Sequence, residues 1–133
     1  MIKRENVIKC DKGWTKLYTP VLELIYAHDD AQSSLSNKIG IRSISCDDGA
    51  LSITPIFKSN LTYEIQKAIF DAEQESLNVC EFCGAKENVG TTMNNEYKTC
   101  CKHCWENRIL GVRPNSIWKD YSTNKSYKAK NNG

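Results

Sequence analysis

The sequence lacks a long hydrophobic run. Its longest apolar stretch, residues 21–27, is interrupted by Glu23, whereas a helix that crosses a bilayer needs about 20 apolar residues. The N-terminal segment also lacks the apolar stretch of about 7 to 15 residues that an export signal requires. We therefore expect a cytoplasmic protein with no membrane partner.

Histidine is scarce, because the chain contains only His28 and His103. The sequence also lacks a glycine-rich phosphate loop and the G-x-S-x-G and H-E-x-x-H motifs of hydrolases and metalloproteases. No residue stands out as a general base that could activate water. We therefore expect no enzymatic activity, no catalytic residues and no small-molecule substrate.

The chain as a whole has no large excess of positive or negative charge, since its net charge at pH 7 is +2. The charge is unevenly distributed, however. Residues 101–133 hold 7 basic and 2 acidic residues, whereas residues 1–100 hold 11 basic and 14 acidic ones. A basic C-terminal end is typical of a surface that meets nucleic acid or an acidic protein.

The first half of the chain predicts a helix followed by a β-hairpin. Thr19 and Pro20 form a helix-start signal, and the apolar face that follows ends near Asp30. Two β-rich stretches, residues 39–44 and 50–57, are separated by a turn that contains Asp48-Gly49, a pair suited to a tight hairpin. We expect the hairpin to face its apolar side onto the first helix.

A second helix is predicted from a cap at Asn60 or Thr62 to about Leu77, with an apolar face toward the same sheet. The 133 residues suit one domain, or one small domain with an appendage. We therefore predict an α+β fold in three parts: a helix/β-hairpin/helix layer over residues 1–78, a zinc ribbon over residues 79–113 and a flexible basic tail over residues 114–133.

Cysteine is abundant, and four of the seven cysteines form two C-x2-C pairs with 17 residues between them, Cys80 with Cys83 and Cys101 with Cys104. This spacing is typical of a zinc site, because one tight turn presents both sulfurs of a pair to one ion. Four sulfur ligands leave no open coordination position, so we expect one structural Zn²⁺. Disulfides are the alternative, but they need an oxidising compartment, and seven cysteines cannot all pair within one chain.

The second pair has neighbours that could replace a ligand. Cys100 with Cys104, or Cys100 with His103, would also give a short spacing. Matching two-residue gaps favour Cys101 and Cys104, which makes Cys100 a neighbouring thiol that packs and His103 a residue that supports the site from outside. The isolated Cys10 and Cys46 are interpreted as small buried apolar residues.

Two C-x2-C pairs also frame the HNH class of nucleases, in which a general-base histidine lies between the pairs. Residues 84–100 contain no histidine, and His28 is interpreted as a residue on a helix face. The spacing of the cysteines therefore favours a non-enzymatic structural zinc site over an HNH-like nuclease.

Basic and aromatic residues gather around and after the second pair. They suit phosphate contacts and base stacking, or contacts with another protein, although a tryptophan next to a ligand more often shields the metal. Nucleic acid remains an alternative partner to a protein. The candidate contact residues are Lys98, Lys102, Trp105, Arg108, Arg113, Lys125, Lys128 and Lys130.

Five motifs follow one another along the chain: G-W at residues 13–14, G-A-L at 49–51, A-E-Q-E-S at 72–76, C-E-F-C-G at 80–84 and T-C-C-K-H-C at 99–104. Over residues 13–104 the chain resembles a poorly characterised family of small zinc-ribbon proteins that are frequent in phages and prophages. Ala50, Ser52 and Cys100 depart from that family, which has glycine, arginine and leucine there. The leucine at the last position favours Cys101 and Cys104 as ligands.

The resemblance implies a phage setting more than a mechanism. In that setting a small adaptor or inhibitor binds a host protein, such as a defence nuclease or a component of the transcription apparatus. We therefore expect a non-enzymatic, zinc-containing effector with a host protein as its partner.

Overall fold

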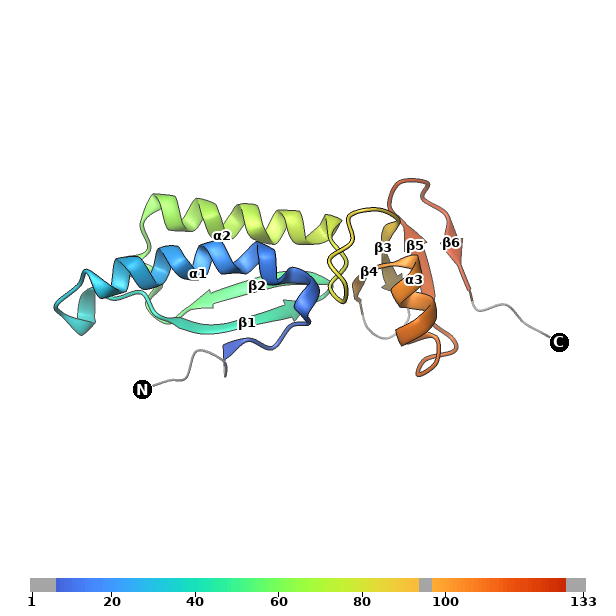
Figure 1. The fold of residues 1–133 in the computed structure, drawn as a ribbon, viewed down its shortest axis with the longest axis horizontal. Helices are drawn as coiled ribbons and strands as arrows, with labels where there is room; N and C mark the ends of the chain where they lie inside the picture. Colours follow the sequence, from blue (N-terminus) through green and yellow to red (C-terminus); the bar gives the residue numbers. More distant parts are fainter. Residues whose placement is uncertain (1–6, 94–96, 129–133) are drawn as a thin grey trace.

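The computed structural model describes residues 7–93 and 97–128. The chain forms two parts that lie end to end along the long axis of the molecule (Figure 1). We call residues 7–79 the helix–hairpin layer and residues 80–128 the ribbon. The mixture of helices with two antiparallel sheets confirms the predicted α+β class.

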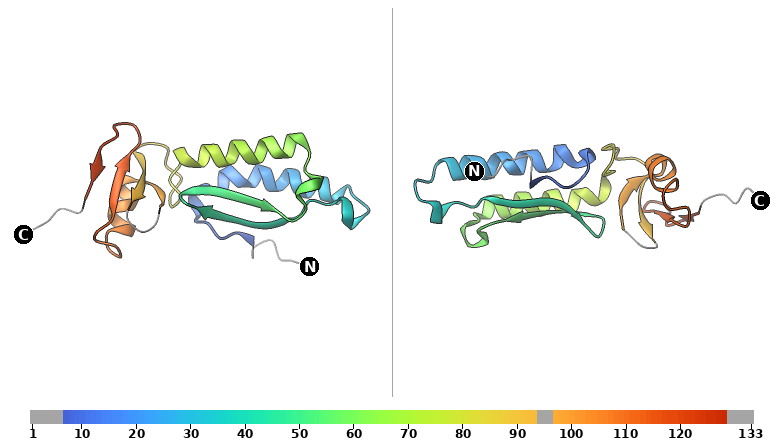
Figure 2. Two further views of the ribbon diagram at one scale, coloured as in Figure 1. Left: turned by 180° about the vertical axis from the view of Figure 1, so that it is seen from behind. Right: turned by 90° about the horizontal axis from the view of Figure 1, so that it is seen from below.

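In the helix–hairpin layer, two helices cover one face of a two-stranded sheet. Helices α1 (Thr15–Asp30) and α2 (Tyr63–Glu75) lie side by side, and strands β1 (Ile41–Asp47) and β2 (Ala50–Pro55) pass beneath them (Figures 1 and 2). The core between these elements consists mainly of aliphatic residues from all four. This arrangement is the predicted helix/β-hairpin/helix layer.

Helix α1 begins five residues earlier than the sequence signal predicted, with Thr15 rather than Pro20 as its first residue. Pro20 therefore lies inside the helix, where it removes one backbone hydrogen bond. Trp14 and Tyr18 are buried, with 0% and 6% of their surfaces exposed, and burial of two large aromatic side chains offsets that cost. Tertiary packing thus outweighs the local signal at Thr19, whose hydroxyl donates instead to the carbonyl of Thr15.

The hairpin turn has the predicted form. Asp48 and Gly49 take φ angles of 51° and 86°, and Asp47 pairs with Ala50 across the turn. Two successive positive φ angles match the right-handed twist of the flanking strands. The turn points toward the ribbon, where the hydroxyl of Thr99 donates a hydrogen bond to the carbonyl of Gly49.

Side chains of α2 and the following turn close the outer edge of β2. The backbone N–H of Leu51 donates to Ser76 Oγ and that of Ile53 donates to Glu73 Oε2, both at 2.9 Å. Pro55, at the end of the strand, has no N–H to offer. This edge is therefore protected from pairing with another chain.

Polar side chains fix the end of the helical layer that lies away from the ribbon (Figure 1). Thr62 caps α2, as predicted, by accepting from the N–H of Ile65. At the same end, the Asp29 carboxylate accepts the N–H groups of Ile39 and Gly40 at 2.7 and 2.8 Å. Burial raises the pKa of Asp29, but these two bonds and the neighbouring His28 outweigh it and hold the pKa below its ordinary value.

The ribbon is a four-stranded antiparallel sheet in the order β4-β3-β5-β6, with one helical turn beside it (Figure 1). Its strands are β3 (Val89–Met93), β4 (Thr99–Cys101), β5 (Ile117–Asp120) and β6 (Ser126–Tyr127). The turn consists of α3 (Lys102–Cys104) and a π-helical extension, Trp105–Ile109.

The prediction of a flexible tail over residues 114–133 is wrong for residues 117–127. Strand β5 pairs with β3, and Trp118 is fully buried with its indole N–H donating to the carbonyl of Cys100 at 2.9 Å. Strand β6 pairs with β5, and Tyr127 lies against Trp118. Trp118 and Tyr127 anchor these short strands. Two residues are too few to produce a visible apolar periodicity, so the sequence pattern did not predict the strands. Residues 129–133, which include Lys130, lie outside the described residues.

Within residues 7–93 and 97–128, no helix combines the length and the apolar character needed to span a bilayer.

Candidate metal centre

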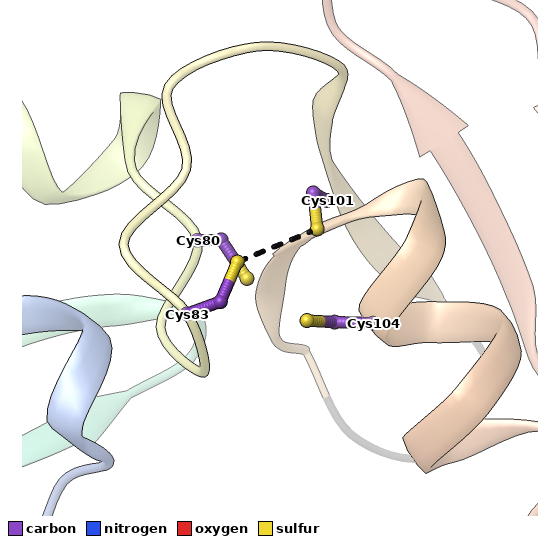
Figure 3. Close-up of side chains that lie close together, drawn as sticks. All are labelled: Cys80, Cys83, Cys101 and Cys104. Carbon is purple, nitrogen blue, oxygen red and sulfur yellow. Dashed lines mark hydrogen bonds between the residues drawn. The ribbon is translucent and has the colours of Figure 1, made fainter.

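The first C-x2-C pair lies on a tight turn directly after the helix–hairpin layer. The N–H of Gly84 donates to the carbonyl of Cys80 at 2.9 Å, and the N–H of Cys80 donates to the carbonyl of Ala85 at 2.8 Å. Gly84 takes a positive φ of 80°, which glycine adopts without steric cost. The turn places Cys80 and Cys83 on the side that faces the second pair (Figure 3).

The second pair lies where strand β4 becomes helix α3. Cys101 is the last residue of β4 and pairs with Val89 of β3, while Cys104 is the last residue of α3. The N–H of Lys102 donates to the carbonyl of Asn88 at 3.0 Å, which ties the start of the helical turn to the sheet. Both sulfurs therefore project toward the first turn (Figure 3).

The four sulfurs form a cluster that could hold one metal ion. All four lie within 4.8 Å of one another, and the sulfurs of Cys83 and Cys101 are 3.7 Å apart. Four sulfurs at about 2.3 Å from a tetrahedral zinc would be about 3.8 Å apart. Cys80, Cys101 and Cys104 are buried, while Cys83 is exposed at the rim. The donor set and its spacing therefore fit a tetrahedral ion.

The electrostatics of the cluster suit a bound cation. Burial raises the pKa of Cys83, but the Ala85 N–H and the other three thiols together outweigh it, and its pKa is lowered. Burial and then the neighbouring sulfurs raise the pKa of Cys104, and burial raises that of Cys101. Ionisation is thus favoured at Cys83 and disfavoured at Cys101 and Cys104, and a divalent cation bound among the sulfurs would stabilise all four as thiolates.

The two alternative ligands lie away from the cluster. Cys100 is fully buried on the other face of β4, and burial followed by the nearby sulfurs raises the pKa of its thiol. His103 is exposed and receives contacts from the side-chain amide of Asn107. Among the described residues, the structure thus brings Cys101 and Cys104 to the first pair.

Cys10 and Cys46 are half-buried and stand apart from the cluster. Burial, and then the charge of Glu81, raises the pKa of each thiol to about 11. Both therefore stay protonated at neutral pH, as expected for cysteines that pack and do not react.

The N-terminal segment braces the first pair. The N–H of Gly13 donates to the carbonyl of Glu81 at 2.7 Å, and the indole of Trp14 donates to the carbonyl of Val79 at 2.9 Å. A β-carbon on Gly13 would overlap the carbonyl groups of Cys80 and Glu81. Only glycine therefore allows this close approach, which couples the metal centre to α1.

Glu81 lies between the two cysteines of the first pair in sequence, and its side chain is buried at the junction of the two parts. It accepts the N–H of Asp11 at 3.3 Å and lies 3.6 Å from the ammonium of Lys98. Burial raises the pKa of Glu81, and the charge of Lys98 partly opposes that effect. The sequence did not predict that Glu81 is buried, because a glutamate between the cysteines of a C-x2-C pair can be either exposed or buried.

The candidate contact residues separate into three groups. Trp105 is 2% exposed, stacks on Trp118 and donates to Ser116 Oγ, so its ring is not presented to a partner. Lys102 lies over the ring of Tyr127 and 3.9 Å from Glu106. The remaining described cations, at positions 98, 108, 113, 125 and 128, lie on the outside of the ribbon, with Lys98 half-buried.

Three of these cations border a groove of about 270 Å³ beside the first pair. Lys98, Arg108 and Arg113 surround a surface to which Phe82, Ile109 and Val112 contribute apolar side chains. The sequence predicted the three cations but missed the apolar residues. Phe82 could have indicated an apolar surface here, because it lies between the two cysteines of the first pair and is not itself a ligand.

No family model, curated protein or solved structure matches this chain.

Proposed function

We propose that this chain is a non-enzymatic zinc protein whose ribbon docks on another protein. The observation that carries the proposal is the closed cluster of four sulfurs at the base of the ribbon. Four thiolates complete a tetrahedral zinc shell and leave no position for water or substrate, which is the mark of a structural ion. The role of the ion is then to stabilise the fold of the ribbon and thereby the surface that the ribbon presents.

The arrangement of aromatic residues favours a protein partner over nucleic acid. Trp105 and Trp118 are buried against each other, so neither offers a face on which a base could stack. The groove beside the first pair has an apolar floor, and the hydrophobic effect is the dominant favourable contribution to most protein–protein association.

Nucleic-acid binding is the second candidate, and exposed cations on the ribbon favour it. Arg108, Arg113, Lys125 and Lys128 are exposed and could meet phosphates. Zinc thiolates and the acidic residues of the ribbon weaken that attraction, since a four-cysteine site with Zn²⁺ carries a formal charge of about −2.

The resemblance to phage and prophage zinc-ribbon proteins suggests the setting of this docking function. In our proposal the chain acts in a bacterial cytoplasm as an adaptor or inhibitor of a host protein. A defence nuclease and a component of the transcription apparatus are the targets that this setting favours.

A matched pair of neighbouring cysteines provides the test. Tagged wild-type protein, Cys101→Ser and Cys100→Ala are compared in affinity capture from a bacterial lysate, with and without nuclease treatment. We expect wild type and Cys100→Ala to retain the same protein and Cys101→Ser to lose it. Of these two neighbouring cysteines, only Cys101 belongs to the cluster of four sulfurs.

Nucleic-acid binding would contradict the proposal in a recognisable way. Captured material would disappear after nuclease treatment, and a gel shift with DNA or RNA would weaken steeply between about 50 and 200 mM salt. Equal capture by all three proteins would instead show that the metal-held surface is not the recognition element.

A further inference from the structure

The groove beside the first cysteine pair has an apolar floor, in which Phe82 and Ile109 pack against the ribbon's core while Val112 lies outside that core. Val112 is 79% exposed, on a turn held by hydrogen bonds from the N–H groups of Val112 and Arg113 to the carbonyl of Ile109, at 3.0 and 2.7 Å. Phe82 and Ile109 are half-buried beside it. The backbone thus presents apolar surface to solvent on a well-fixed turn.

The rim of the groove is cationic. Arg108 lies over the ring of Phe82, with 5.3 Å between its Cζ atom and the ring centroid, and Arg113 and Lys98 stand on other sides. Buried Glu81 lies 3.6 Å from the ammonium of Lys98. Lys98, Arg108 and Arg113 thus give the rim three basic side chains, and both arginines are exposed.

The size of the groove restricts its occupant. Pockets for cofactors and other small ligands usually measure about 300 to 1,000 Å³, and this groove, at about 270 Å³, falls just below that range. It suits one or two side chains of a peptide. A guanidinium pairs with a carboxylate through two parallel hydrogen bonds, so the rim selects acidic neighbours for the side chain on the floor.

We propose that this groove binds a short acidic segment of the partner protein, in which an apolar side chain contacts Phe82, Ile109 and Val112 while carboxylates pair with the rim. The inference rests on the proposed function, because it names the partner chemistry for the docking ribbon. The negative charge of a zinc–thiolate centre lies close by, so recognition depends on short ion pairs at the rim and not on a long-range field.

Designed peptides test this proposal directly. The zinc-loaded, ¹⁵N-labelled full chain is titrated with an amidated peptide that carries Leu-Phe between two runs of three acidic residues. Two matched peptides carry Ala-Ala in place of Leu-Phe, or glutamines in place of the acids, and an oligo-dT strand serves as the nucleic-acid probe. Amide chemical shifts report where each probe binds.

We expect the first peptide to shift the signals of Phe82, Ile109 and Val112 and to bind at least about tenfold more tightly than either matched peptide. Equal binding of the acidic Ala-Ala peptide would overturn the proposal, because simple charge attraction would then explain it. Binding of oligo-dT at the groove without binding of the peptide would also overturn it.

Two substitutions on the groove and one control away from it complete the test. Arg108→Glu reverses a rim charge, and Val112→Glu alters an exposed side chain that the fold does not need. Arg42→Glu makes the same change of charge as Arg108→Glu at an exposed position on β1. We expect about tenfold weaker peptide binding for both groove variants and wild-type binding for Arg42→Glu. Wild-type binding by both groove variants would overturn the proposal.

The lysate capture separates failure of this inference from failure of the proposed function. If the captured protein is lost with Cys101→Ser but retained by both groove variants, the ribbon docks through another surface, and only this inference fails. If wild type captures nothing except nucleic acid, the proposed function itself fails.

Discussion

The two parts of the chain are built around different cores. The helix–hairpin layer buries mainly aliphatic and aromatic side chains from both helices and both strands. Among the described residues of the ribbon, one buried cluster consists of four cysteines together with Trp105 and Trp118. The first part is therefore stabilised by burial of apolar surface, whereas we expect the second to depend on a metal ion held by its clustered sulfurs.

The largest expected effect is the selective loss of the ribbon when metal is removed. Apparent binding energies of structural zinc reach about 10 to 16 kcal/mol, comparable with the whole stability of a small domain. After chelation, we expect amide signals of residues 80–128 to collapse toward random-coil positions while those of residues 7–79 remain dispersed. Two-dimensional NMR, with elemental analysis to verify metal removal, makes the measurement.

Cys100→Ala is the control for that comparison, because Cys100 is buried but lies outside the sulfur cluster. This variant should keep its metal and its dispersed ribbon signals. A metal-free ribbon that stayed dispersed would show that the two Trp residues suffice as a core.

A smaller effect is expected where the two parts meet. In Gly13→Ala the new methyl group would overlap the backbone carbonyls of Cys80 and Glu81, which the metal centre holds in place. Overpacking of this kind costs about 1 to 3 kcal/mol. Denaturant unfolding of the zinc-loaded protein measures the loss of stability.

Gly111→Ala provides the matched substitution, because a β-carbon at Gly111 meets no atom within 4 Å. It should change the free energy of unfolding by no more than about 0.5 kcal/mol. Equal stability of the Gly13 and Gly111 variants would mean that the N-terminal segment does not brace the metal centre.

Local signals predicted most of the helix–hairpin layer and the positions of the four clustered cysteines. The Asp48-Gly49 turn, the Thr62 cap and the C-x2-C pairs are each encoded within a few residues, so the sequence reveals them. The start of α1 and the strands β5 and β6 depend on distant partners of Trp14 and Trp118, and no local pattern carries that information. The apolar floor of the groove was missed because Phe82 and Val112 meet only in three dimensions.

The smallest expected effect lies at the far end of the helix–hairpin layer, at Asp29. Hydrogen bonds to a charged group contribute about 1.5 to 3 kcal/mol each, and Asn can accept only one of the two bonds that Asp29 accepts from Ile39 and Gly40. We expect Asp29→Asn to lose about 1 to 2 kcal/mol at pH 7. Denaturant unfolding across a pH series checks this expectation.

The pH dependence follows from the lowered pKa of Asp29. A carboxyl group whose pKa is lower in the folded state contributes its stability above its ordinary pKa, and that contribution is lost as the pH falls through the folded value. The difference between wild type and Asp29→Asn should therefore shrink as the pH falls from about 4, the ordinary pKa of an aspartate, through the lowered pKa of Asp29. The exposed neighbour variant Asp30→Asn should follow wild type at every pH, and a loss as large as that of Asp29→Asn would contradict this assignment.

X-ray absorption at the zinc edge tests the central claim most directly. Protein purified without added metal should contain one zinc per chain, and the spectrum should fit four sulfur neighbours at about 2.3 Å. Absence of a stoichiometric metal, or a nitrogen neighbour in place of one sulfur, would contradict an ion held by Cys80, Cys83, Cys101 and Cys104.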